Sequence, residues 1–561
     1  MKMSKYILII LLFVQLAIPV TAGVYKVSTK SQLEETVAAV FPGDTVLLAA
    51  QDWNDVSLEF KGEGSELSPI VFGAEAPGQT IFTGNSRIEI SGNWLVVRDF
   101  IFREGNVIDE GSIVAFRTST STLANHCRLT NVTIEDYNPS NASIDTKYVS
   151  LYGTNNRVDH CSFSGKTNSG ATFVVWLDQT PDYHLIDHNY FGPRPNLGVN
   201  GGETIRIGTS DWESYNSNCI VEYNLFDQCD GEIEIISNKS VGNHYRYNTF
   251  LNCDGTLTLR HGSYCKVYGN FFFGADNKNS GGVRIIGEGH EVYNNYFEGL
   301  NGTSYRAAIS LVNGMPDSPA SGYYQVKKAK IGFNTIINCK QTIAVGAGKD
   351  ESKTLPPEDC EIVNNLIKGR SGYAVVEDYD VTTGITWDGN IYESDLLGIS
   401  PDDGLIRADV EMDESGGFYR PAGDNVGIGA ATASMELVVT DIDGQSRPQN
   451  NRDVGCDQLS NDEVLIRPLS KEDVGADYSV GTSVGIRKIN KGKVLYDYDG
   501  LSIVFPSMEA RDVSIWTIEG RKIKQISCNQ PVCRFQNSNN RGIKVITVNE
   551  GDRSYSLKVM L

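Results

Sequence analysis

The sequence predicts an all-β protein in which a right-handed parallel β-helix is followed by a small antiparallel β-sandwich. The first observation is an internal repeat, because a short apolar stretch, an asparagine and an apolar or aromatic residue recur every 22 to 39 residues. A basal period in the low twenties with variable insertions indicates a solenoid whose coils carry loops. The second observation is that the repeated segments are short, rich in β-branched and aromatic residues, and broken by Gly, Asn and Asp, which favours strands. The repeated asparagines are Asn189, Asn224, Asn248, Asn270, Asn295, Asn334, Asn365 and Asn390.

The repeated asparagines have two possible roles in such coils. Their amides can hydrogen-bond to one another as a ladder, because neighbouring strands lie about 4.8 Å apart. Alternatively, they are simply turn residues. We expect the ladder, and neither role is catalytic.

The N-terminus has the pattern of a secretory signal. Lys2 and Lys5 lead into an apolar run over residues 6–20, and small residues end at Ala22. The run is short for a membrane span, and no later segment is long and apolar enough to be one. We therefore expect residues 1–22 to be a signal peptide and the mature protein to be exported and soluble, without a membrane span.

The predicted β-helix covers residues 23–456, with its first coil starting near Tyr25. Residues 31–40 form the only clear amphipathic helical pattern in this region. We expect this short helix to cap the open apolar end of the solenoid, since uncovered strand edges invite aggregation.

The C-terminal part has a different sequence pattern. Hairpin turn signals separate segments in which apolar and polar residues alternate, such as residues 513–518. The turn dipeptides are Asp499-Gly500, Glu519-Gly520 and Glu550-Gly551. They predict a linker over residues 457–491 and a small antiparallel sandwich over residues 492–561. This part resembles the C-terminal sorting domains of secreted Bacteroidetes proteins, and a plain accessory sandwich fits equally well. The resemblance implies a Gram-negative source, with the protein in the periplasm, on the cell surface or secreted.

The cysteines and the net charge argue against a zinc-binding protein and a nucleic-acid-binding protein. Eleven cysteines are an odd number, and most lie inside apolar repeats, where an unpaired Cys packs as a small hydrophobe. Cys528 and Cys533 are the best candidates for a disulfide. No cysteine or histidine spacing suggests zinc. The net charge of −21 argues against nucleic acid as a partner, because a basic footprint is missing.

One stretch of the repeat concentrates charged residues of both signs. Glu232 and Glu234 lie two residues apart, so they share one face of a strand, and Lys239 and Arg260 follow within about one coil. Paired carboxylates suit a hard cation such as Ca²⁺, whereas lysine and arginine suit an anionic substrate. A surface ion pair of little energetic value is the alternative interpretation of the same residues.

These residues, in this order, resemble polysaccharide lyase family six, which contains alginate lyases and the dermatan-cleaving chondroitinase B on a parallel β-helix. The resemblance spans roughly residues 25–456 and is most specific over residues 200–284. It implies Lys239 as the Brønsted base and Arg260 as the Brønsted acid. The residues that match calcium ligands are Asn200, Glu232 and Glu234. The residues that match substrate contacts are Arg206, His261 and Arg284, with Tyr148 and Tyr323 as further tyrosines that contact the sugar.

The chemistry of uronan cleavage fits this residue set. β-Elimination removes the proton on C5, next to the uronate carboxylate, and releases the 4-oxygen. A bound Ca²⁺ would neutralise the carboxylate and stabilise the charge that develops beside it. Arginine stays charged at ordinary pH, so Arg260 could instead stabilise the leaving oxygen while water delivers the proton.

Several functions remain open at this point. Alginate is the expected substrate and the chain is expected to act as a monomer; a dermatan sulfate lyase would favour a dense basic cluster, which is missing near these residues. A glycoside hydrolase needs two carboxylates across a glycosidic bond, but would leave the lysine and arginine without a purpose. A non-catalytic glycan-binding β-helix would function without Lys239.

Overall fold

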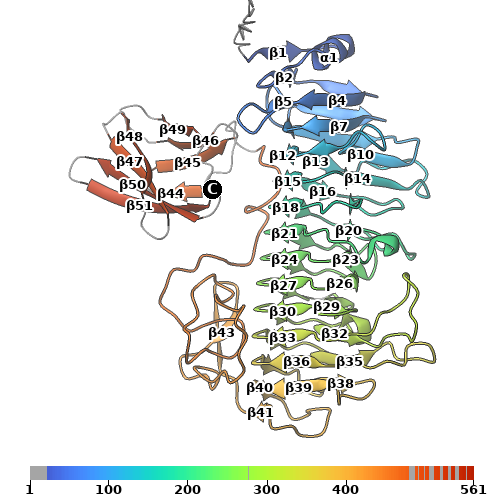
Figure 1. Cartoon of the computed structure of the whole chain (residues 1–561), viewed down its shortest axis with the longest axis vertical. Coiled ribbons are helices and arrows are strands. Elements are labelled where there is room, and N and C mark those ends of the chain that lie inside the picture. Colours follow the sequence, from blue (N-terminus) through green and yellow to red (C-terminus); the bar gives the residue numbers. More distant parts are fainter. Residues whose placement is uncertain are drawn as a thin grey trace, which may run out of the picture.

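The computed structural model describes residues 22–478, except residue 276, and eight strands between residues 487 and 560. The predicted signal peptide therefore lies outside the described residues, apart from Ala22. Three long sheets of parallel strands form the larger part of the chain, and successive strands along the sequence pass from one sheet to the next. The coils stack in chain order, which confirms the parallel β-helix (Figure 1).

The first sheet has 14 strands. They are β1 (Val24–Val27), β2 (Thr45–Leu48), β5 (Ile70–Ala74), β8 (Leu95–Arg98), β12 (Arg128–Thr130), β15 (Arg157–Asp159), β18 (Leu185–Asp187), β21 (Ile220–Glu222), β24 (His244–Arg246), β27 (Lys266–Tyr268), β30 (Glu291–Tyr293), β33 (Lys330–Gly332), β36 (Cys360–Val363) and β39 (Ile385–Asp388).

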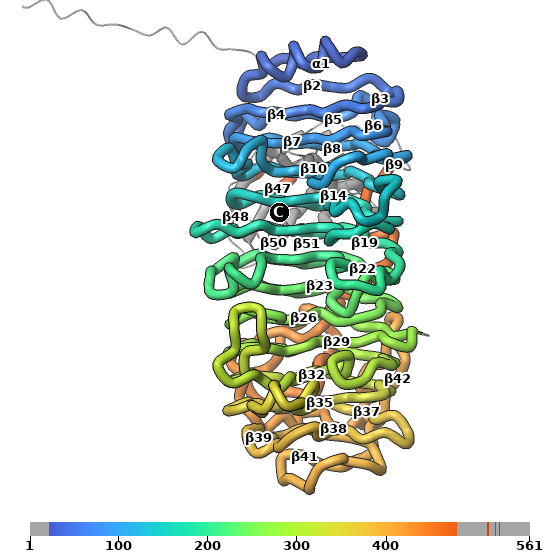
Figure 2. The backbone as a smooth tube through the Cα atoms, turned by 90° about the vertical axis from the view of Figure 1, so that its right-hand side faces the viewer, coloured from blue at the N-terminus to red at the C-terminus, as the bar shows by residue number. Residues whose placement is uncertain are grey.

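Several strands of the second sheet are labelled in Figure 2. This sheet, called the site sheet below, has 13 strands. They are β4 (Ser57–Glu63), β7 (Arg87–Asn93), β10 (Gly111–Ala115), β11 (Ala124–Asn125), β14 (Thr146–Leu151), β17 (Phe173–Val175), β20 (Ile205–Ile207), β23 (Glu234–Lys239), β26 (Gly255–His261), β29 (Ser280–Ile285), β32 (Ile309–Val312), β35 (Ile343–Ala347) and β38 (Val376–Asp378).

The third sheet again has 14 strands. They are β3 (Asp52–Asn54), β6 (Thr80–Gly84), β9 (Phe100–Gly105), β13 (Thr133–Glu135), β16 (Ser162–Ser164), β19 (Tyr190–Phe191), β22 (Leu225–Asp227), β25 (Thr249–Leu251), β28 (Phe271–Phe273), β31 (Tyr296–Glu298), β34 (Thr335–Ile337), β37 (Leu366–Lys368), β40 (Asn390–Glu393) and β41 (Leu405–Arg407).

Stacks of identical side chains hold neighbouring coils in register. The eight repeated asparagines form the predicted ladder, in which each side-chain amide donates to Oδ1 of the next asparagine at 2.8 to 3.0 Å. All eight are fully buried. Inside the coils, five phenylalanines stack with ring centroids 4.5 to 4.9 Å apart. These are Phe191, Phe226, Phe250, Phe272 and Phe297.

The expected capping helix is present but shorter, as α1 (Lys30–Val37). The Thr29 side chain accepts a hydrogen bond from the backbone N–H of Gln32, which starts the helix. Leu33 and Val37 are buried against the first coil, so α1 covers the apolar end of the solenoid. Among the described residues no helix is long and apolar enough to cross a membrane.

The nine cysteines between residues 127 and 456 are buried and unpaired, as expected of small hydrophobes. The side chains of Cys528 and Cys533 lie outside the described residues, so their disulfide stays a prediction. Two short 3-10 helices lie in loops beside the site sheet, at Ser210–Trp212 and Ser304–Arg306.

The chain leaves the last coil through the hairpin β42 (Met412–Ser415) and β43 (Phe418–Pro421) and then returns along the third sheet. Leu469 N–H donates to Thr249, and the hydroxyl of Tyr478 donates to the carbonyl of Phe100, near the opposite end of the solenoid. The first part of the predicted linker is thus a strap held against the coils.

The C-terminal strands form two four-stranded antiparallel sheets, as the sequence predicts for a small β-sandwich. One contains β44 (Arg487–Ile489), β45 (Gly492–Asp497), β46 (Gly500–Val504) and β49 (Val532–Gln536). The other contains β47 (Arg511–Thr517), β48 (Lys522–Cys528), β50 (Ile543–Glu550) and β51 (Arg553–Met560). The domain boundaries at residues 456 and 492 stay predictions.

Candidate active site

Apart from Tyr148, the predicted site residues lie on the outer face of the site sheet or on the loops beside it. On β20 the buried Ile205 and Ile207 point into the core, so Arg206 between them points outward. Arg206 pairs with Ser237 on β23, and two strands further on Arg284 occupies the same row of β29. Successive coils therefore place a single line of side chains on one surface.

Three carboxylates meet at the start of β23. Burial, with repulsion from Glu203 and Glu234, raises the pKa of Glu232 to about 8, although Lys239 and the backbone N–H of Gly201 oppose the shift. Oε1 of Glu232 and Oε2 of Glu203 are buried with no hydrogen-bond partner among the described residues. Crowded carboxylates with unpartnered oxygens are the donor set that a hard cation satisfies.

The other two proposed calcium ligands differ in exposure, because Glu234 is buried and Asn200 is not. Asn200 is exposed on the loop that leads to Glu203, whereas Glu234 accepts a hydrogen bond from the Ser237 hydroxyl at 2.5 Å. Within the described part of the chain, no three His, Cys, Asp or Glu side chains are spaced to hold an ion as they stand. The chemistry of the donors fits calcium, and closure around an ion would require Asn200 and the carboxylates to move together.

Arg260, the predicted acid, is held from three sides. Its Nε lies 3.7 Å from Oε1 of Glu234, and its two amino groups donate to the carbonyls of Gly322 and Ser321 at 2.5 and 3.0 Å. The guanidinium also lies 4.2 Å from the ring centroid of Tyr323. Burial lowers the pKa of Arg260, and Glu234 opposes that shift.

Arg284 and Tyr323 also lie at the site, as predicted. Arg284 is 2% exposed, and its NH1 lies 3.6 Å from Oε1 of Glu234. Its NH2 donates to the Tyr323 hydroxyl at 3.1 Å, and its guanidinium covers the ring of Tyr305 at 4.3 Å. Glu234 thus faces two arginines, which places strong positive potential beside the carboxylates.

Lys239 and His261 are register partners on β23 and β26. Burial, with the charges of Arg260 and Lys239, lowers the pKa of His261 to about 3, so its imidazole is neutral at neutral pH. Its Nε2 lies 3.1 Å from the Ser210 hydroxyl, and its buried Nδ1 has no partner among the described residues. His261 is therefore a neutral polar contact beside the predicted base.

Tyr148 does not lie on this surface. Its side chain is 0% exposed, and its hydroxyl donates to the carbonyl of Ser164 inside the coil. The backbone N–H groups of Tyr148 and Val149 both donate to the carbonyl of Thr172, which breaks the alternation of β14 and turns Tyr148 inward. The expectation that Tyr148 contacts sugar is incompatible with this burial. In the coils of β14 and β17, the aromatic side chains that are only partly buried are instead Tyr152 and Trp176.

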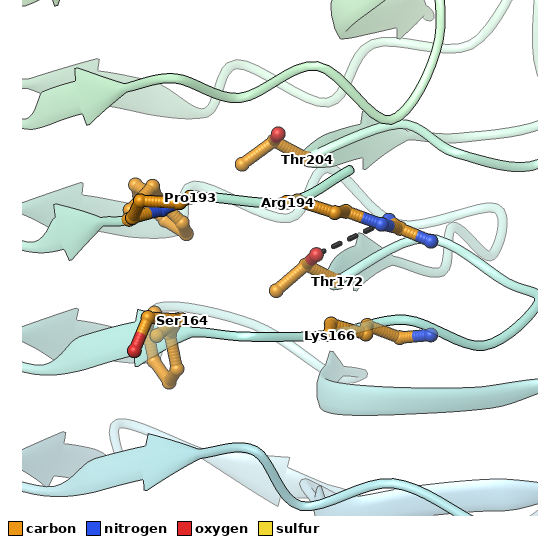
Figure 3. A pocket seen from close by; sticks show the side chains of 9 residues that line it. Ser164, Lys166, Thr172, Pro193, Arg194 and Thr204 are labelled. Atoms are coloured by element: carbon orange, nitrogen blue, oxygen red, sulfur yellow. Dashed lines mark hydrogen bonds between the residues drawn. The ribbon is translucent and has the colours of Figure 1, made fainter. Parts of the chain in front are cut away.

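Sequence reasoning also missed Glu203 and its support. The buried guanidinium of Arg194 donates to the Thr172 hydroxyl at 3.2 Å (Figure 3). Arg194 donates to the Glu203 carbonyl as well, at 2.9 Å. It also donates to the carbonyls of Asn168 and Gly170, so it ties the Glu203 segment to the preceding coil. The feature of the sequence that could have indicated Glu203 is its place in Asn-Gly-Gly-Glu, three residues after Asn200.

Comparison with known proteins agrees with this arrangement. The profile of the family described as Chondroitinase B matches residues 27–431. The chain belongs to that family, polysaccharide lyase family six. No curated protein sequence matches the chain.

Solved structures of polysaccharide lyase family six share the fold. The alginate lyase AlyGC is 33% identical with a TM-score of 0.72, over 83% of this chain and 60% of AlyGC. A mannuronic acid-specific family-six lyase from the human gut microbiota is 30% identical with a TM-score of 0.64, over 69% of this chain and 92% of its own. A family-six lyase from Pseudopedobacter saltans, at 24% identity and a TM-score of 0.61, over 81% of this chain and 100% of its own, shows the fold alone.

Proposed function

We propose that this family-six lyase is an alginate lyase that cleaves 1,4-linked uronans by calcium-assisted β-elimination. The observation that carries the proposal is the meeting of Glu203, Glu232 and Glu234 with Lys239 and Arg260 on one face of the site sheet. A carboxylate cluster with unpartnered oxygens beside a lysine and an arginine suits an anionic sugar whose own carboxylate must be neutralised.

In this proposal each residue has a defined task. Lys239 takes the C5 proton, the bond from C4 to the 4-oxygen breaks, and a double bond forms between C4 and C5. Arg260 donates hydrogen bonds to the departing oxygen, which finally receives a proton from Arg260 or from water. His261, Arg206, Arg284 and Tyr323 hold the substrate, and the Tyr323 ring also lies against the guanidinium groups of Arg260 and Arg284.

Calcium would be held by Asn200, Glu232 and Glu234, with Glu203 as a fourth candidate. Bound there, it supplies positive charge that neutralises the uronate carboxylate and makes the adjacent proton more acidic. The bound ion would then be the partner of the buried carboxylate oxygens that lack a hydrogen bond.

Alginate is proposed over dermatan sulfate because two similar proteins at 30% identity or more are described as an alginate lyase and a mannuronic acid-specific lyase. Dermatan sulfate cleavage, as the family description suggests, is the second candidate. We also retain the expectation, from residues 1–22, that the protein is exported to the periplasm, the cell surface or the medium.

The test follows the ultraviolet absorbance of the unsaturated uronate, which only elimination creates. Purified protein is incubated with polymannuronate, polyguluronate and dermatan sulfate in parallel, with and without EDTA. A rise on an alginate block that EDTA abolishes supports the proposal. A rise on dermatan sulfate alone would transfer it to the second candidate, and a flat trace on all three would refute both.

A further inference from the structure

A line of side chains runs across the site sheet from Lys239 toward the N-terminal coils. Strand pairing places one residue of each coil in this line, because β14, β17, β20 and β23 pair in parallel register. The members are Tyr152, Trp176, Gly208 and Lys239. The coils of Gly208 and Lys239 approach each other closely, because a Cβ atom on Gly208 would lie 2.9 Å from the Lys239 carbonyl oxygen. Trp176 is therefore two coils from the predicted base, about 10 Å at the usual strand spacing.

The two aromatic rings in this line form a stacked platform. The rings of Tyr152 and Trp176 lie nearly parallel, at 8°, with centroids 6.1 Å apart. The indole N–H of Trp176 donates to the Ser150 hydroxyl at 3.1 Å, which fixes the ring orientation. Both side chains are only partly buried, so part of each ring reaches the outer surface.

Cations flank the platform on both sides. The guanidinium of Arg117 lies 3.9 Å from the Tyr152 ring centroid, and that of Arg206 lies 5.2 Å from the Trp176 centroid. Among the described residues neither arginine has a carboxylate within ion-pair distance, and the buried Nε of Arg206 has no hydrogen-bond partner. A third cation, Lys147, lies 5.9 Å from Trp176 but is paired with Asp145.

A second aromatic stack in this protein has only a structural role and can be compared with the platform. His160, His188, Tyr223 and Tyr247 stack on successive coils away from the site sheet. There the neighbouring arginines are neutralised within the protein. The pairs are Arg128 with Asp159, Arg157 with Asp187 and Arg246 with Glu222. Arg117 and Arg206 keep their charge available, which is expected where an anion binds.

From this contrast we infer that Tyr152, Trp176, Arg117 and Arg206 form a distal subsite for a uronate residue of the same polymer, about two coils from the cleavage point. The apolar C–H groups of the sugar contact the exposed parts of the rings, and its carboxylate meets the unpaired guanidinium groups. Gly208, which carries no side chain, lies between the platform and Lys239 and leaves the path of the polymer open. This inference rests on the proposed lyase function.

The test compares wild type with Trp176→Ala and Tyr152→Ala on oligouronates of increasing length. We expect kcat/KM to fall about tenfold on chains long enough to reach the platform, the size of one lost aromatic contact. On the shortest cleaved oligomer the loss should be less than about twofold, since that substrate ends before the platform. Trp176→Phe keeps a ring and should recover most of the difference. Tyr183→Ala, an exposed tyrosine away from the site sheet, is the matched control.

Equal losses at every length, or no loss at any length, would overturn the subsite. A wild-type protein that eliminates no uronan would refute the proposed function instead. In that case the subsite is tested by titrating the same oligouronates into wild type and Trp176→Ala. Length-dependent binding that the substitution weakens would support it, and equal binding would refute it.

Discussion

Glu234 and Arg260 form an ion pair across two neighbouring strands of the site sheet. Oε1 of Glu234, at the start of β23, lies 3.7 Å from Nε of Arg260, near the end of β26. A register shift after Glu234 and another before Lys239 bring these side chains together at different heights of the two strands. A proposed metal ligand and the proposed acid therefore orient each other, and a change in either should be felt by both.

Arg260→Lys should lower kcat by about 10²-fold or more, because one ammonium group cannot replace donors aimed in three directions. The lysine would also lose the contacts to the carbonyls of Gly322 and Ser321. We therefore expect the loop over residues 313–326 to be cut faster by protease. Arg407→Lys, at an exposed pair with Asp395, is the control. Unchanged turnover in Arg260→Lys would contradict the assigned role.

Lys239→Ala should lower kcat by roughly 10²- to 10⁴-fold, the range for loss of a general base. Oligouronate binding should persist, because the arginines and His261 remain. Lys330→Ala, on β33 of the first sheet, removes an exposed lysine away from the site and should change neither quantity. Retained turnover in Lys239→Ala would favour a different base, and binding as the only activity of wild type would favour a glycan-binding protein.

The ladder gives a prediction about stability. Asn270 donates to the carbonyls of Tyr245 and Tyr268 and to Asn295, and its Oδ1 accepts two hydrogen bonds from Asn248. Asn270→Ala leaves buried donors and acceptors unpaired, at about 1–3 kcal/mol for each group. We expect a clear fall in Tm by circular dichroism. Asn279→Ala, which removes an exposed amide, should leave Tm almost unchanged.

The repeat could be found from the sequence because each ladder asparagine recurs in the same local pattern. Glu232 and Glu234 could be grouped because alternation within a strand fixes which side chains share a face. Lys239 and Arg260 followed only from the resemblance to the family, because Lys239 lies five residues after Glu234 and β23 has two register shifts between them. The position of Tyr148 could not be predicted, because a bulge within β14 turns its side chain into the coil. Glu203 was missed because its relation to Glu232 depends on the stacking of two coils.

The strap over residues 457–478 also could not be predicted from the local sequence pattern. Its contacts with Thr249 and Phe100 join residues 220 and 378 positions apart in the chain. Its sequence has the polar composition of a linker. The surface that holds it exists only once the coils have assembled.

Glu232 predicts how calcium and pH act together on stability. Its folded pKa of about 8 lies above the unfolded value of about 4.3, so the folded metal-free protein binds the extra proton between those values. Stability contributed by this group is therefore present at low pH and is lost as the pH rises through about 8. Calcium prefers the ionised carboxylate, so its stabilising effect should be larger near pH 8 than near pH 6.

The measurement is Tm by differential scanning fluorimetry, in EDTA and in excess calcium, across this pH range. Glu232→Gln should raise Tm in EDTA near pH 8, because the amide removes the repulsion from Glu203 and Glu234, and it should abolish most of the calcium response. Glu361→Gln, which changes a partly exposed side chain on β36 of the first sheet, should keep both the pH dependence and the calcium response. A wild-type calcium shift that is equal at both pH values, or that survives in Glu232→Gln, would remove Glu232 from the calcium site.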